Sequence, residues 1–238
     1  MFKTELDKLL FEPPPPGCVL SLTGLPQSGG TIQDRSPYGN NGTITGATWT
    51  RLPSGLWVLQ FDGTDDYVKV LDHSSLDIIN TLTLEAWIKR DVIGAYHGII
   101  AKYNLNGTQN SFLLAISDSN KPNFRVSKDG AYSGATITSL FGATNLLANI
   151  WYHVVATYQY VADGTSIMKL YLNGVEDGTT SVAVGPIFVT TTDVYLGAYS
   201  VPDIFLDGLI GLPRIDNSTL NALGITNHYN QERHLFGV

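Results

Sequence analysis

Cysteine is almost absent from this 238-residue sequence, since Cys18 is the only one. No disulfide can form within the chain, so the fold has to be held by a packed core. Lys and Arg are also few, 14 against 21 Asp and Glu, and the formal net charge is −7. We expect no nucleic-acid partner, because binding to a phosphate backbone depends on clustered cations and no basic run occurs.

Long apolar runs are missing as well. No segment approaches the roughly 20 apolar residues that a membrane-spanning helix requires, so no membrane span is expected. Residues 1–8 are charged throughout, without the apolar core or small-residue cleavage site of a secretion signal. We therefore expect the protein to be made in the cytoplasm without a signal peptide.

Glutamate is scarce, which bears on catalysis. A glycoside hydrolase needs two carboxylates on one face, roughly 5 Å apart when it retains configuration. The one glutamate inside an apolar strand pattern, Glu85, has Trp87 and Lys89 at the same-face positions. Glu85 is predicted to be a polar residue at a sheet surface, and His153 a structural residue at a sheet margin. The chain is not expected to be an enzyme.

Short apolar segments and turn residues dominate what is present. Hydrophobic residues make up 43% of the chain, and 24 Gly and 11 Pro are scattered between the apolar segments. This composition is typical of one domain with many short strands. Strands are predicted at 56–61, 67–70, 82–88, 98–103, 111–117, 123–127, 150–158, 168–172, 182–189 and 194–197. Asn173-Gly174 predicts a two-residue hairpin.

The N-terminal segment 1–17 differs from the domain expected at 18–238. Four of its apolar residues share one face at helical spacing, and a run of four prolines follows. These residues are Phe2, Leu6, Leu9 and Leu10. The pattern predicts a short amphipathic arm on a stiff polyproline spacer. Docking on its own domain and docking on a neighbouring subunit both remain open.

The C-terminal end offers the one helix expected within the domain. Ser218 is a candidate N-cap, with Leu220, Leu223 and Tyr229 as candidate anchors. This helix is expected to cap the edge of the sheet.

Four segments stand in an order and spacing that one all-β family uses. They are 61–70 (Phe-Asp-Gly-Thr-Asp-Asp-Tyr-Val-Lys-Val), 82–88 (Leu-Thr-Leu-Glu-Ala-Trp-Ile), 151–158 (Trp-Tyr-His-Val-Val-Ala-Thr-Tyr) and 168–175 (Met-Lys-Leu-Tyr-Leu-Asn-Gly-Val). Together they resemble the laminin-G-like, concanavalin A-like family of lectins and glucanases. The resemblance covers nearly all of the chain after residue 17. It implies an antiparallel jelly-roll β-sandwich.

The resemblance also implies a calcium site, because many relatives bind Ca²⁺ through loop oxygens. Asp34 would be the side-chain ligand, with carbonyl groups near Gly39 and Asn41 adding to it. Gly211 stands where relatives often have a second carboxylate. The alternative, that Asp34 caps a turn, therefore stays open.

Sugar sites combine an aromatic platform with polar groups on loops. Tyr96, His97, Tyr132 and Tyr199 lie in loops of the expected kind and are candidate glycan-binding residues. Exposed loop residues without a ligand are the alternative.

Three functions are compatible with these observations. The first is a non-enzymatic structural or interaction protein displayed on a larger assembly, such as a phage or viral particle. Its partners would be other protein subunits, either copies of itself or a capsid or appendage protein, and it would locate to the particle surface. The second is a stand-alone carbohydrate-binding module. A glycoside hydrolase is the third and is disfavoured by the scarcity of carboxylate pairs.

Overall fold

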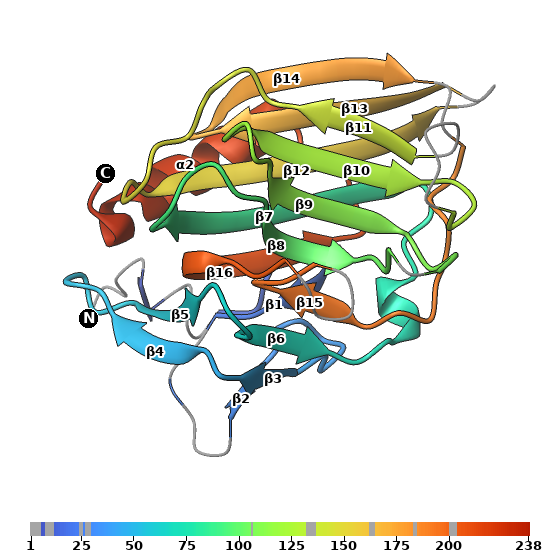
Figure 1. Ribbon diagram of the computed structural model, residues 1–238. Coiled ribbons are helices and arrows are strands. Elements are labelled where there is room, and N and C mark those ends of the chain that lie inside the picture. Colours follow the sequence, from blue (N-terminus) through green and yellow to red (C-terminus); the bar gives the residue numbers. More distant parts are fainter. Residues whose placement is uncertain are drawn as a thin grey trace.

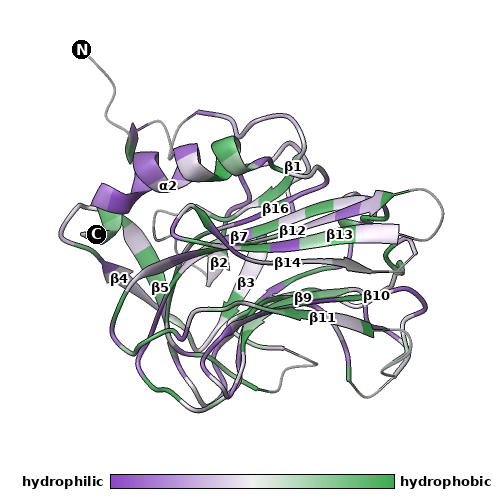
Figure 2. Cartoon of the chain, turned by 90° about the horizontal axis from the view of Figure 1, so that it is seen from above, coloured by the Kyte–Doolittle hydropathy of each residue, from purple (hydrophilic) through white to green (hydrophobic). Residues whose placement is uncertain are grey.

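The computed structural model describes residues 6–7, 12–23, 26, 30–105, 107–131, 137–161, 165–182, 185–199 and 204–238. Within these ranges two antiparallel sheets pack face to face, and a C-terminal helix lies on the outside of one of them (Figure 1 and Figure 2). The predicted jelly-roll β-sandwich with a C-terminal helix is confirmed.

The first sheet has the spatial order β14-β13-β12-β7-β16-β5-β4, and β1 pairs with the C-terminal end of β16. Its strands are β1 (Cys18–Ser21), β4 (Thr48–Arg51), β5 (Trp57–Asp62), β7 (Thr81–Arg90), β12 (Tyr152–Val161), β13 (Thr165–Leu172), β14 (Val175–Val182) and β16 (Asp207–Asp216).

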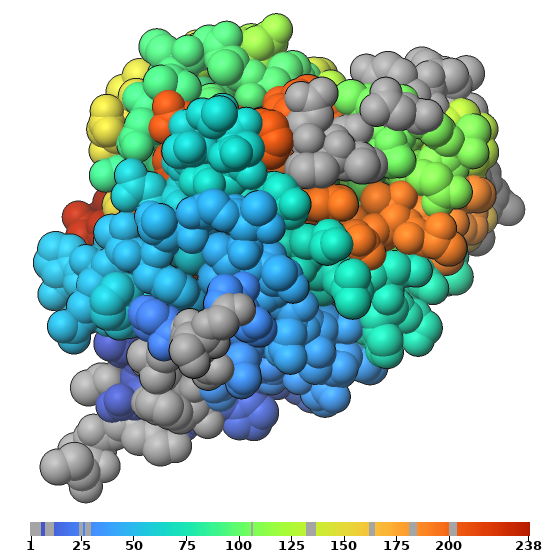
Figure 3. Space-filling view, turned by 60° about the horizontal axis from the view of Figure 1, so that its bottom comes forward, coloured from blue at the N-terminus to red at the C-terminus, as the bar shows by residue number. Residues whose placement is uncertain are grey.

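The second sheet has the order β11-β10-β9-β8-β15-β6-β3-β2. Its strands are β2 (Thr31–Ile32), β3 (Gly42–Thr45), β6 (Tyr67–Val70), β8 (His97–Lys102), β9 (Phe112–Ile116), β10 (Pro122–Ser127), β11 (Ile137–Phe141) and β15 (Val194–Leu196). A short 3-10 helix, η1 (Ser74–Leu76), lies between β6 and β7. Figure 3 shows the face on which the N-terminal strands, blue to cyan, gather.

Strand β7 shows how the sequence divides between two buried layers. Side chains alternate across a strand, so every second residue faces the other sheet. The inward residues Leu82, Leu84, Ala86 and Ile88 belong to the core between the sheets. The outward residues Thr83, Glu85 and Trp87 are equally buried, each 0% exposed, because α2 (Ala222–Phe236) and the 218–220 segment cover them.

A bulge in β16 decides which way its charged end points. Ile210 faces the core between the sheets, and strict alternation would point Arg214 the same way. The pairing with β7 shifts between Gly211 and Arg214, where Leu212 has a φ of 49°. The extra residue reverses the alternation, so that Ile215 enters the core and Arg214 faces α2.

The hairpin prediction at 173–174 is confirmed, but the predicted strand after it is wrong. Asn173 and Gly174 have φ values of 52° and 80°, as a type I′ turn requires. Strand β14 therefore starts at once, at Val175, and ends at Val182, where the strand predicted at 182–189 would begin. Its polar sequence concealed it, since alternation of apolar and polar residues is weak there.

Helix α2 begins later than predicted. The Asn221 side chain accepts a hydrogen bond from the Gly224 N–H at 2.8 Å, which makes Asn221 the N-cap in place of Ser218. The Ser218 carbonyl instead accepts the Thr83 hydroxyl at 2.7 Å. The helix ends at Gly237, whose φ is 76°.

The helix also covers a face of the first sheet and not its edge, as Figure 2 shows. The reason is an apolar cluster on that outer face, which needs a cover. Leu220 and Tyr229 pack as predicted, but Leu223 is 69% exposed and is no anchor. The outer cluster consists of Leu56, Val58, Trp87, Trp151, Leu209, Leu212, Leu235 and Phe236.

Part of the N-terminal arm lies against the chain's own domain. Leu6 is half-buried and packs on the outer cluster. Phe2, Leu9 and Leu10 lie outside the described residues. In the part of the chain that the structure describes, no helix has the length and apolar character needed to cross a membrane.

Candidate functional site

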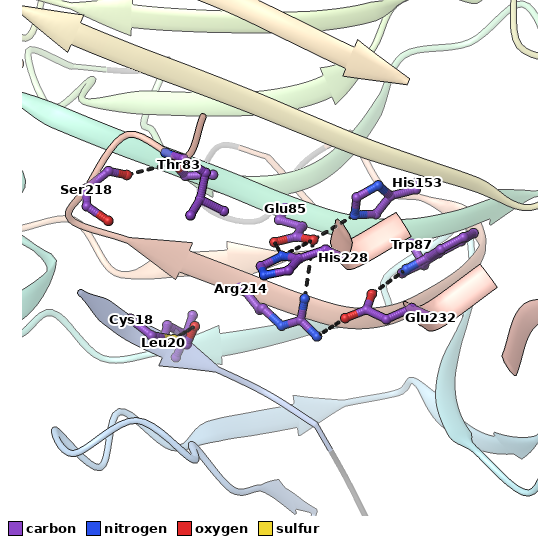
Figure 4. Close-up of polar contacts among 11 residues, drawn as sticks. Cys18, Leu20, Thr83, Glu85, Trp87, His153, Arg214, Ser218, His228 and Glu232 are labelled. Atoms are coloured by element: carbon purple, nitrogen blue, oxygen red, sulfur yellow. Dashed lines mark hydrogen bonds and ion pairs between the residues drawn. The ribbon is translucent and has the colours of Figure 1, made fainter. Parts of the chain in front are cut away.

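Five titratable side chains gather between the first sheet and α2 (Figure 4). They are Glu85, His153, Arg214, His228 and Glu232, and we call this group the charged layer. Glu85 and His153 are 0% exposed and Glu232 is 2% exposed. A buried charge is costly unless it is paired, so the contacts within the layer decide its character.

Glu85 is the centre of the charged layer. Its Oε1 lies 2.6 Å from His153 Nε2 and accepts a hydrogen bond from Arg214 Nη1 at 3.2 Å. Its Oε2 lies 3.0 Å from His228 Nδ1. Arg214 also binds Glu232, whose second carboxylate oxygen accepts the Trp87 indole N–H at 2.7 Å. Every oxygen of the two carboxylates therefore has at least one protein partner.

The geometry of the elements explains this convergence. Arg214 is the direct cross-strand partner of Glu85 in the pairing of β16 with β7. His153 lies on β12, the strand on the other side of β7. His228 and Glu232 are four residues apart on α2 and so project from the same side of the helix.

The pairing sets the charge states. Burial alone would raise the pKa of Glu85, but Arg214, His153 and His228 outweigh it and hold that pKa well below its usual value. Burial disfavours the charged form of His228, yet its hydrogen bond to Glu85 raises its pKa above the usual value. Burial likewise opposes the charge of Arg214, and Glu232 and Glu85 restore it by raising the pKa. The charged layer is thus a network of ion pairs.

Two sequence predictions are corrected here. Glu85 was expected at a sheet surface, and it is wholly buried because three cationic or hydrogen-bonding partners compensate its charge. His153 was expected at a sheet margin, and it lies inside the charged layer, where its Nε2 is hydrogen-bonded to Glu85.

A cavity of about 330 Å³ adjoins the charged layer. Residues 12–15, β1, β16 and α2 enclose it, and Arg214, His228 and Glu232 form part of its lining. Asp216, two residues beyond Arg214, also lines it and is 4% exposed. Burial, assisted by the negative charge of Glu85, raises the pKa of Asp216 to about 6.

Asp34 organises a turn. Its Oδ1 accepts hydrogen bonds from the backbone N–H groups of Ser21 and Ser36, at 2.8 Å and 2.9 Å. Its Oδ2 accepts hydrogen bonds from the backbone N–H of Asn40 and from the Ser36 hydroxyl. Asn41 Oδ1 in turn accepts the Asp34 N–H at 2.9 Å. A carboxylate offers about four lone-pair positions, and all are occupied. As placed, the Asp34 carboxylate has no free lone-pair position for a calcium ion, and Gly39 serves the turn with a φ of 69°.

A second acidic group occupies the turn between β5 and β6, where Asp62, Asp65 and Asp66 have carboxylate oxygens within 4.8 Å of one another. Asp62 Oδ1 accepts the N–H of Thr64 at 2.8 Å, and Asp66 Oδ2 accepts the N–H of Asp62 at 2.9 Å. These bonds are those of a tight turn, which agrees with the resemblance of 61–70 to a family motif.

The candidate glycan residues are brought only partly together. Tyr96 and Tyr199 lie with ring centroids 6.4 Å apart, and Arg125 lies over the Tyr96 ring at 5.5 Å and donates to its hydroxyl at 2.8 Å. Tyr199 is 4% exposed and His97 is 2% exposed, so neither is the exposed loop residue that was expected. Tyr96 remains half-buried. Tyr132 lies outside the described residues.

The sequence did contain a signal for the missed residues. Arg214 and Asp216 alternate with Ile215 in an apolar strand, and His228 and Glu232 have the spacing of one helix face. Charged residues on the outward side of a strand are usually solvated, however, so the pattern did not distinguish a buried network from an exposed face.

Residues 62–226 match a family model described as the concanavalin A-like lectin/glucanases superfamily. The fold and the motif segments thus define a lectin-like jelly roll, and the chain belongs to this superfamily. No match was found among the curated proteins compared with it.

Several solved structures are similar in fold. The binding domain of Paraclostridial Mosquitocidal Protein 1 has a TM-score of 0.70 and 15% identity, with 90% of this chain and 52% of that one covered. The botulinum neurotoxin type G receptor-binding domain has a TM-score of 0.62 and 14% identity, with 90% and 51% covered. A structure of botulinum neurotoxin type C, a toxin whose cell entry is described as dependent on interaction with two ganglioside molecules, has a TM-score of 0.65 and 17% identity. It is matched over 90% of this chain and 51% of that one. The chain spans about half the length of these domains, and the likeness shows the fold alone.

Proposed function

We propose that this protein is a non-enzymatic interaction module that works as a component of a larger assembly, with a phage or viral particle surface as its setting. It would bind other protein subunits through its surface, and glycans are a second class of ligand. The similar toxin structures are binding domains by description, which supports recognition over catalysis.

The observation that carries the non-enzymatic part of the proposal is the pairing of the two buried glutamates, Glu85 and Glu232, with protein donors. Their oxygens lie within 4.8 Å, close to the roughly 5 Å separation of a retaining glycosidase. Such an enzyme needs one carboxyl with a raised pKa as its acid, whereas Arg214 and the histidines hold the pKa of Glu85 low. Glu85 is also beyond the reach of any substrate under α2. The pair stabilises the fold and does not perform hydrolysis.

The first test is hydrolysis of β-glucans by the purified full-length protein, with Glu85→Gln as the comparison. We expect no release of reducing sugar from either. Activity in the wild type that Glu85→Gln abolishes would overturn the non-enzymatic proposal.

The assembly part is tested by light scattering of the full-length protein and of a variant lacking residues 1–11, which keeps the proline segment of the cavity wall. We expect the full chain to form a closed oligomer or filament and the shortened chain to lose this assembly while remaining folded. A full-length monomer, or two variants of equal mass, would contradict a role of the arm in assembly.

A second candidate function, glycan binding, is favoured by Tyr96, whose half-buried ring is held by Arg125. A glycan array should then lose signal with Tyr96→Ala and keep it with Tyr38→Ala, which removes an exposed tyrosine elsewhere. Equal array signals from the two variants would exclude Tyr96 as the platform.

Calcium binding stays a prediction, and calorimetric titration of metal-stripped protein with Ca²⁺ tests it.

A further inference from the structure

The cavity beside the charged layer contains an acceptor without a donor. Asp216 is 4% exposed and lines the cavity, and its carboxylate forms no hydrogen bond or ion pair with any residue that the structure describes. Buried polar groups in folded proteins are nearly always paired. Asp216 therefore calls for a donor that the described residues do not supply.

The neighbouring cation is already engaged. Arg214 donates a hydrogen bond from Nη1 to Glu85 and another from Nη2 to Glu232. Its effect on Asp216 is a Coulomb interaction without a hydrogen bond. His228 directs Nδ1 to Glu85. As placed, neither residue donates a hydrogen bond to Asp216.

The cavity wall formed by Pro13, Pro14 and Pro15 strengthens this conclusion, because proline has no backbone N–H and offers only a carbonyl oxygen. This part of the wall therefore supplies no backbone donor to Asp216. At about 330 Å³, the cavity is at the small end of the range for ligand pockets, roughly 300 to 1,000 Å³.

We propose that this cavity is a binding site for a protonated primary amine, with the Asp216 carboxylate as its anchor. The amine can belong to a free alkylammonium ion or to a lysine side chain. Such a cation donates to Asp216 and to the proline carbonyls while its alkyl stem lies along the proline rings.

Other ligand classes fit less well. A calcium ion needs six to eight oxygens, and Asp216 is the one buried carboxylate here that protein donors leave free. A sugar site needs an aromatic platform, and no Phe, Tyr or Trp lines the described cavity.

The test is titration with n-butylammonium chloride at pH 7.5, followed by nuclear magnetic resonance, with n-butanol as the uncharged probe. We compare the wild type with Asp216→Asn and with Asp207→Asn, which removes another carboxylate from the same strand. We expect butylammonium to shift signals from β1, β16 and α2, and the dissociation constant to rise at least tenfold in Asp216→Asn and to stay unchanged in Asp207→Asn.

Nα-acetyl-lysine amide distinguishes the two sources of the amine. Binding of both probes assigns the site to a lysine side chain, and binding of butylammonium alone assigns it to a free amine. Equal affinity for n-butanol, equal affinity of the two variants, or no shift beyond that caused by sodium chloride would overturn the proposal.

A measurement on the wild type alone guards against misfolding of Asp216→Asn. Bound butylammonium must lower the pH at which the assigned Asp216 carboxyl carbon titrates, because the cation favours the ionised form. An unchanged titration would also overturn the proposal.

Discussion

Leu84 and Glu85 are neighbours on β7, both 0% exposed, yet they belong to layers that are stabilised in different ways. Leu84 lies in the apolar core between the sheets, where any hydrophobic side chain of similar size is a satisfactory neighbour. Glu85 lies under α2, where its buried negative charge is compensated by three particular partners, His153, Arg214 and His228. The comparison teaches that an equally buried position can tolerate or forbid change according to whether its contacts are directional.

The largest effect is expected from Glu85→Ala, which leaves Arg214 and His228 buried without their carboxylate. Breaking one side of a buried ion pair costs about 3 to 5 kcal/mol. Urea unfolding should show this loss. Replacing Glu85, Arg214 and Glu232 together, as Glu85→Leu, Arg214→Met and Glu232→Leu, should cost less than Glu85→Ala alone, since no carboxylate or guanidinium of the layer is then left unpaired. If the triple change costs more, the layer is not held by charge pairing.

Leu84→Ala, the matching change in the apolar core, should cost about 3 kcal/mol through lost burial and a residual cavity. The same urea unfolding measures it. Leu84→Met conserves volume and should cost under about 1.5 kcal/mol. The comparison would fail if Leu84→Met were as damaging as Leu84→Ala, because the core would then be as specific as the charged layer.

Asp216→Asn should stabilise the protein by about 3 kcal/mol above pH 7 and have little effect near pH 4. The pKa of Asp216 is raised from 3.8 to about 6, so the folded state binds the proton more tightly than the unfolded state. The stability contributed by this proton is complete below about pH 4 and is lost as the pH rises through 6. Thermal unfolding of both proteins from pH 4 to 8 measures the difference.

The titratable groups around Asp216 are the same in both proteins: Glu12, Cys18, Arg35, Glu85, Arg214, His228 and Glu232. Their titration therefore contributes to the difference only through their coupling to Asp216. A difference that grows toward low pH would contradict the raised pKa of Asp216.

The smallest effect is expected at the helix that covers the charged layer. Asn221→Ala removes the N-cap of α2 and should cost about 1 kcal/mol, whereas Asn221→Asp should be nearly neutral. Thermal unfolding of the two variants provides the measurement. Equal stabilities of the alanine and aspartate variants would show that the side-chain cap does not hold the helix in place.

Much of the fold could be predicted from local patterns. Alternation in 82–88 assigns each side chain to a face, and Asn173-Gly174 specifies a turn through its need for positive φ. The prediction for strand β14 was wrong because a polar strand shows weak alternation of apolar and polar residues. The predicted start of α2 was wrong because Ser218 and Asn221 are both acceptable N-caps.

The site could not be predicted in the same way. Alternation placed Glu85 on the outward face but could not say what would cover that face. His228, which pairs with it, lies 143 residues later in the chain. The bulge at 211–214 turns Arg214 outward, and no pattern of apolar and polar residues in this segment predicts it.

The sequence by itself therefore determined the sandwich, many of its strands and the face to which each residue of β7 belongs, because these follow from a period of two and from turn chemistry. Only the tertiary structure decided that the outward face is buried, that Glu85 is paired and that Asp216 is left without a donor among the described residues. Those outcomes depend on where α2 docks and how β16 bulges, and both are settled by contacts between segments far apart in the chain.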